Sequence, residues 1–232
     1  MFISQSLCNC IKLDDAVHTG SKISMDGVFM KKIVKRVALC LSVAVLIFLA
    51  GIMADRRTLR ESLIRLHVVA NSDSAEDQAI KLQVRDAVVE SLQDAMADIA
   101  DMEQAKAYIQ ENLPKIQTVA NQVLFDAGVD VDAVVTLAEE TFVTRYYDTF
   151  TLPAGVYEAL RITIGEGEGH NWWCVVFPNL CLPATSDGFS DVAAGAGFDS
   201  TLTATLKEEF GFEIRFFLLD KLGELENMFF GG

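Results

Sequence analysis

The sequence is poor in cysteine and in positive charge. Both shortages limit the classes of protein to which it can belong. It has five cysteines in 232 residues. Only Cys174 and Cys181 lie beyond residue 54, and one pair does not make the disulfide scaffold of a small secreted domain. Lysine and arginine number 19 against 33 aspartate and glutamate, a net charge of −14. An acidic surface repels polyphosphate, so nucleic acid is not an expected partner.

The charge is also unevenly spread along the chain. Residues 1–54 hold six basic and three acidic residues, a charge of +3, and the rest holds 13 basic and 30 acidic residues, a charge of −17.

About half of the residues are hydrophobic (51%) and 22% are charged, which suits a sizeable core and argues against wholesale disorder. No internal repeat is present. The length suits one globular domain with accessory segments.

The basic end carries a membrane-targeting pattern. Val37–Ala54 is a run of eighteen residues without a charge, and a cluster of four Lys and Arg at 31–36 precedes it. A basic flank held inside and an apolar run entering the bilayer are typical of a signal peptide or a transmembrane helix, and the length lies between the two. A buried core helix is the alternative. We expect residues 1–36 in the cytosol, with 1–29 either an extension or an artefact of the start, since Met30 is a second possible start.

Beyond the apolar run, the spacing of apolar residues predicts strands and helices in turn. A strand is predicted at 63–70, a helix ending near Met96 and a second helix at 102–125 that Pro114 kinks or splits. The period then changes to two, which predicts strands at 134–138, 142–147, 156–164 and 172–177. A loop at 183–199, a short helix at 202–210 and a last strand at 213–219 follow. This order predicts an α+β fold, a mainly antiparallel sheet with two or three helices packed on one side, after the N-terminal signal or transmembrane helix.

Two long motifs resemble a known family. Residues 65–74 read RLHVVANSDS and continue through 76–78 and 81–88. Residues 152–161 read LPAGVYEALR, and residues 165–178 read GEGEGHNWWCVVFP. These segments resemble the opening and the second block of the stage II sporulation protein R family, in the right order and after an export segment. The resemblance predicts an exported signalling domain at 55–182, whereas residues 1–29 and 183–232 do not match.

The resemblance implies a messenger in endospore formation. Members of the family are made in the forespore and exported across its membrane into the intermembrane space. There they activate, by protein contact, a membrane-embedded aspartic protease, stage II sporulation protein GA, which cleaves the precursor of the mother-cell sigma-E factor. The implied protein is not an enzyme and needs no cofactor and no small-molecule substrate.

The tryptophan pair is the first candidate for contact with such a partner. Neighbours on a strand point to opposite faces, so Trp172 and Trp173 lie on different faces. Tryptophan is enriched at interface hot spots, which makes either ring a possible anchor. The alternative is a central strand covered on both faces.

Two loops supply the remaining candidates. The glycine-rich stretch 165–169 is predicted as a flexible hairpin connection or a contact loop. A phosphate loop is excluded because no Lys-Ser/Thr follows and the glutamates repel phosphate. The candidate contact residues in this stretch are Glu166, Gly167 and Gly169. Asn171, which follows His170, is a further candidate. Asn71 and Asp73 are predicted first as helix caps and second as contacts.

Cys174, His170 and Cys181 leave chemical alternatives open. A Cys/His nucleophile would make the protein a secreted hydrolase acting on the cell envelope, but it needs a third orienting group. A zinc site needs four ligands and the spacing supplies three, so no metal is expected. A disulfide between Cys174 and Cys181, or two buried thiols, is preferred. A structural envelope protein retained through residues 37–54 is the further alternative.

Overall fold

The computed structural model describes residues 27–96, 99, 101–147, 149–178, 189–195, 198–208 and 212–230. The chain divides into two units, residues 1–46 and 47–232. Helix α1 (Gly27–Ser62) contains the whole apolar run. Its side chains there are mostly exposed, for example Leu46 at 65% and Ile47 at 69%, so the buried-core alternative is wrong. Among the described residues, α1 is the one helix long and apolar enough to cross a membrane.

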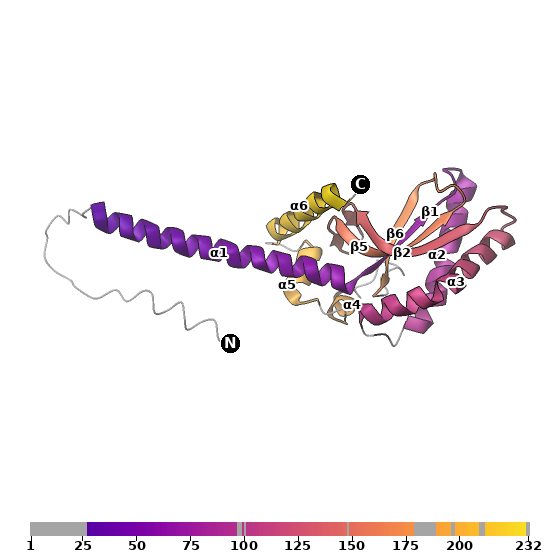
Figure 1. Cartoon of the computed structure of the whole chain (residues 1–232), viewed down its shortest axis with the longest axis horizontal. Coiled ribbons are helices and arrows are strands. Elements are labelled where there is room, and N and C mark those ends of the chain that lie inside the picture. Colours follow the sequence, from indigo (N-terminus) through magenta and orange to yellow (C-terminus); the bar gives the residue numbers. More distant parts are fainter. Residues whose placement is uncertain are drawn as a thin grey trace. The chain divides into compact units, whose positions relative to one another are not determined.

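The second unit is built on a four-stranded mixed sheet (Figure 1). Its strands are β1 (Ile64–Val69), β2 (Ala133–Phe142), β5 (Gly155–Ile164) and β6 (Asn171–Phe177), in the order β2-β5-β1-β6. β1 is parallel to β5, and the other two pairings are antiparallel. The α+β class is therefore confirmed. Two short strands, β3 (Arg145–Tyr146) and β4 (Thr151–Leu152), pair separately.

One face of the sheet packs against α2 (Ala75–Met96) and α3 (Met102–Asp126). Alternate residues of β1 and β5 supply this core because side chains on a strand alternate between faces. Local capping starts both helices: Ser74 Oγ accepts the Asp77 N–H at 3.0 Å, and Asp101 accepts the Gln104 N–H at 2.9 Å. α3 passes through Pro114 as a single helix, so the predicted split does not occur.

The opposite face carries a second core. Leu59 in the last turn of α1 and Leu63 just after it are buried there with Tyr157 of β5 and with two short helices, α4 (Phe189–Gly195) and α5 (Ser200–Leu206). The last helix, α6 (Glu213–Phe230), packs against β5 and β2. The sheet is thus covered on both faces, and β6 is an edge strand and not the central strand that its two apolar faces suggested.

The largest error of the sequence-based prediction concerns the last element. The predicted strand at 213–219 is the first part of helix α6. Its buried residues Phe216, Leu219 and Gly223 recur at helical spacing, and the run of β-prone Phe and Leu concealed this period. β2 also continues to Phe142, which leaves only β3 from the predicted strand at 142–147. α4 lies within the predicted loop at 183–199.

Candidate functional site

Two loops meet at one end of the sheet and bring together most of the residues predicted to contact a partner. Because β1 lies between β5 and β6, the stretch 165–170 crosses the end of β1 instead of forming a hairpin, so the hairpin prediction is wrong. The backbone N–H of Glu168 donates to the Asn71 carbonyl at 3.1 Å, and that of Gly169 donates to the Ala70 carbonyl at 2.9 Å. The Asn71 side chain accepts the N–H of Glu166 at 3.1 Å.

The glycines of this stretch have a steric reason to be there. Gly165 has φ +53°, and a Cβ on it would lie 2.2 Å from the Asn71 Oδ1. A Cβ on Gly169 would lie 2.3 Å from the carbonyl oxygen of Ser72. Side chains at these positions would push the two loops apart. We call residues 70–77 and 165–171 together the loop cluster.

The loop cluster is acidic and exposed at its surface. Asp73 accepts hydrogen bonds from the backbone and ring of His170, and its predicted role as a cap belongs instead to Ser74. The hydrogen bond from His170 lowers the pKa of the Asp73 carboxyl. Hydrogen bonds from Ser72 and Asn71 likewise lower the pKa of Asp77. Asp73 and Asp77 are therefore ionised at neutral pH, and the surface suits polar or basic groups of a partner.

The two tryptophans diverge, as expected for strand neighbours. Trp172 is partly buried against the α2/α3 core, with the Arg85 guanidinium 4.2 Å above its ring. Trp173 is partly buried against the opposite core and lies between His67, stacked at 5.6 Å, and Arg145, 3.4 Å from the ring centre. Both rings therefore serve the packing of the domain, and neither is a freely exposed anchor.

A polar ladder links the Trp173 face to the loop cluster. His67 contacts the Glu140 carboxylate at 2.8 Å and the Asn171 side chain at 3.0 Å, so both of its ring nitrogens have partners. Arg161 also bonds to Glu140 at 3.2 Å. Burial alone would raise the pKa of Glu140, but the interactions with His67 and Arg161 outweigh it and lower the pKa.

A fully buried arginine lies beside this ladder. The Arg65 guanidinium lies 4.0 Å from the centre of the Phe142 ring and 5.2 Å from that of Tyr157, and it donates to the Tyr147 hydroxyl at 3.0 Å. Its Nε and Nη1 find no hydrogen-bond partner within the described part of the chain. Ring faces thus provide much of the compensation for burying this cation.

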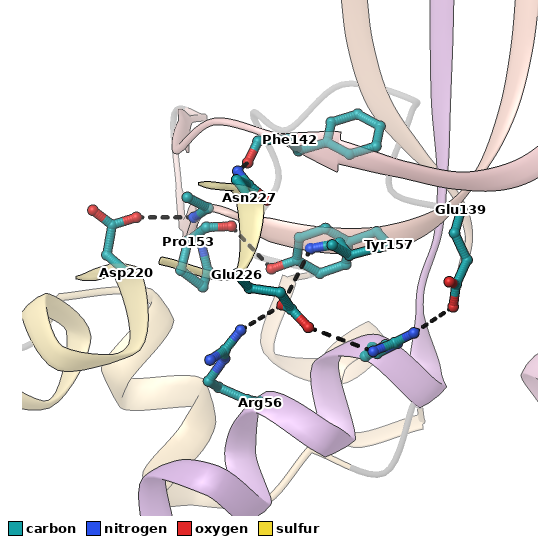
Figure 2. A network of polar contacts seen from close by, with 11 residues as sticks. Arg56, Glu139, Phe142, Pro153, Tyr157, Asp220, Glu226 and Asn227 are labelled. Atoms are coloured by element: carbon teal, nitrogen blue, oxygen red, sulfur yellow. Dashed lines mark hydrogen bonds and ion pairs between the residues drawn. The ribbon is translucent and has the colours of Figure 1, made fainter. Parts of the chain in front are cut away.

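The residues that sequence reasoning missed lie where α1 ends. A cavity of about 470 Å³ is lined by α1, the 153–157 turn and α6. Figure 2 shows Glu226 of α6 pointing at Arg56 of α1, with the two groups 2.5 Å apart. Arg60 bonds to both Glu226 and Glu139. These partners are separated by up to 170 residues, and a single sequence carries no signal of such a pairing.

The structure excludes the hypothesis that Cys174 is a catalytic nucleophile. Cys174 is buried and disulfide-bonded, which removes it as a nucleophile because a thiolate is required. Cys181 lies outside the described residues, so the pairing of the two stays a prediction. Within the described ranges, no group of three or more His, Cys, Asp or Glu side chains is placed to hold a metal ion.

Comparison with known proteins shows to which family the chain is similar. The family model for stage II sporulation protein R matches residues 60–187. Stage II sporulation protein R of Bacillus subtilis (strain 168) is 34% identical over 184 residues, which cover 71% of this chain and 82% of that protein. No solved structure matches. The residues that the family model matches contain the core against α2 and α3 and the whole loop cluster, and the chain belongs to the stage II sporulation protein R family.

Proposed function

We propose that the protein is an exported sporulation signal that activates, by direct contact, the membrane-embedded aspartic protease stage II sporulation protein GA. That protease would then process the sigma-E precursor in the mother cell. The observation that carries the proposal is the family membership, joined to an exposed apolar helix that leads directly into the matched domain. The proposed location is the space between the forespore and mother-cell membranes, with α1 as a signal or anchor.

The proposed mode of action is binding and not catalysis. The one buried cysteine suggested as a nucleophile is in a disulfide, and the ring of His170 is engaged with Asp73. The Glu140 carboxylate, a second one in contact with a histidine, is held by His67 and Arg161 in an internal ladder. These groups are satisfied by one another, which supports a structural role for them.

The loop cluster is the proposed contact surface. Asp73, Glu166, Glu168 and His170 are exposed on it, and its backbone is held by hydrogen bonds from both loops. A preorganised surface binds with a smaller loss of conformational entropy than a mobile one. Asn71, Gly167, Gly169 and Asn171 then position this surface, whereas Trp172 and Trp173 support it from the two cores.

Co-production in a host that does not sporulate tests the proposal. The full chain, the protease and the sigma-E precursor are produced together, and precursor cleavage is followed by immunoblotting. Cleavage should rise with the wild-type chain and fall several-fold with the double variant Glu166→Lys, Glu168→Lys. Glu90→Lys, Glu111→Lys, the same double charge reversal on the exposed surfaces of α2 and α3, is the matched control and should cleave like wild type. Cleavage that does not depend on the chain would refute activation, and equal loss in the control would refute the surface.

A further inference from the structure

The last helix has its apolar face turned outward. Ile214, Phe217, Leu225, Met228 and Phe229 are exposed, between 47% and 82%. Their positions recur at helical spacing and share one side of α6. A helix that packs on a soluble domain normally turns this side inward, and exposed apolar patches of this kind mark interaction sites.

Several charged and polar side chains of α6 point into the domain. Asp220 accepts the Ala154 N–H at 2.8 Å, and Asn227 donates to the Phe142 carbonyl at 2.7 Å (Figure 2). Arg215 pairs with Asp55 at 2.6 Å, and Glu226 pairs with Arg56 at 2.5 Å. The inward side of α6 thus combines these polar contacts with the buried Phe216 and Leu219, while a second set of apolar residues stays exposed on the outward side.

The position of α6 identifies what its apolar side would meet. The Arg215 guanidinium lies over Gly51, with a nitrogen 3.5 Å from where a Cβ would stand, and Gly51 belongs to the apolar run of α1. Ile47 and Met53 on the same stretch of α1 are exposed at 69% and 55%. The start of α6 therefore lies beside the end of the apolar run of α1.

We infer that α6 is an interfacial helix that lies in the headgroup region of the bilayer into which residues 37–54 insert. This inference rests on the membrane insertion of α1 in the proposed function. Lipid is the occupant because the start of α6 adjoins a segment of membrane-spanning composition and the outward side of the helix is apolar. Repulsion from anionic lipids is limited, since Asp220 and Glu226 face inward and Glu224 pairs with Lys221 at 2.6 Å. The helix thereby fixes the height and tilt of the signalling domain above the membrane.

Spin-label accessibility in liposomes tests the inference on the full chain. Phe229→Cys and Phe217→Cys are made in a background in which Cys8, Cys10 and Cys40 are serine. Each is labelled with a nitroxide and reconstituted in phosphatidylcholine–phosphatidylglycerol vesicles. Collision rates with oxygen, which partitions into lipid, and with a water-soluble nickel chelate report the depth of the label. Phe125→Cys, an equally exposed aromatic at the end of α3, is the aqueous control.

A second control separates this inference from the proposed function. Native Cys40, a free cysteine in the apolar run, is labelled in a chain that lacks only Cys8 and Cys10. The expected result is an oxygen-to-nickel ratio at Phe229 and Phe217 several-fold above that at Phe125 and close to that at Cys40. A water-like ratio at both α6 positions, with a lipid-like Cys40, would overturn the inference and leave the proposed function standing. Shielding from both reagents would also overturn it, by showing that a second copy or another protein covers α6. A water-like Cys40 would defeat membrane insertion itself.

Discussion

Replacing Gly223 by alanine should detach α6 from the domain. A Cβ at this position would lie 1.6 Å from the carbonyl oxygen of Ala154, whereas real Cβ contacts are not shorter than 3.0 Å. The helix and the 153–155 turn must therefore separate by about 1.4 Å. That movement stretches the 2.8 Å hydrogen bond from the Ala154 N–H to Asp220 beyond useful length.

The energetic consequence can be estimated from three effects. Overpacking costs about 1–3 kcal/mol, and loss of a hydrogen bond to a charged group costs about 1.5–3 kcal/mol. Alanine is favoured over glycine in a helix by about 1 kcal/mol, which offsets part of this. The net loss should be about 2–4 kcal/mol in the free energy of unfolding. For a domain of this size, that lowers Tm by about 5–15 °C.

The assay is thermal unfolding of the full chain in detergent, followed by tryptophan fluorescence, which reports both cores through Trp172 and Trp173. Gly195→Ala is the matched control because nothing lies within 4 Å of the added Cβ, and it should melt like wild type or slightly higher. If Gly223→Ala melts with wild type, α6 does not dock as described, and the reasoning on its outward face fails with it.

Three further predictions follow from the packing and charge of the domain. Gly165→Ala should lower the free energy of unfolding by about 1–3 kcal/mol, because it combines a positive φ with a clash against Asn71; urea unfolding measures this, and an unchanged midpoint would contradict it. Leu59→Ala should cost about 2–5 kcal/mol because Leu59 is 1% exposed, whereas the exposed Arg57→Ala should change little; equal stability of the two would show that the end of α1 is not part of the core. The Glu140 carboxylate, whose pKa is lowered, stabilises the fold above its ordinary value of 4.5, and this contribution is lost as the pH falls through the lowered pKa. Wild type and Glu140→Gln should therefore converge in stability as the pH is lowered below 4.5, and a constant difference would refute the assignment.

Alternation and motif content made much of the matched domain predictable. The alternation in LIRLHVVA predicts that Leu66 and Val68 share a face, and both are buried against α2 and α3. The same rule separates Trp172 from Trp173 correctly. Strand order is different, because it depends on which edges meet in three dimensions. The local sequence pattern does not show that β1 lies between β5 and β6, so the glycine-rich stretch was predicted as a hairpin.

The end of the chain was hard to predict for a physical reason. α6 buries Phe216 and Leu219 but also exposes Phe229 and other large apolar residues. It directs the polar groups of Asp220 and Glu226 inward, so it lacks the single apolar side by which a packed helix is recognised. Its partners on α1, such as Arg56, lie 170 residues away. The burial of Arg65 could not be predicted from the sequence either, since an arginine in a strand is ordinarily expected at the surface.

The claim that the protein signals by direct contact is tested most directly by photo-crosslinking. A photoreactive residue replaces Glu166 in the loop cluster, or Glu111 on α3 as the control, and each chain is co-produced with the membrane protease. Irradiation should join the protease to the chain labelled at 166 and not to the chain labelled at 111. A crosslink from 111 but none from 166 would contradict the assigned surface, and no crosslink from any exposed position, in membranes where cleavage is stimulated, would contradict signalling by contact.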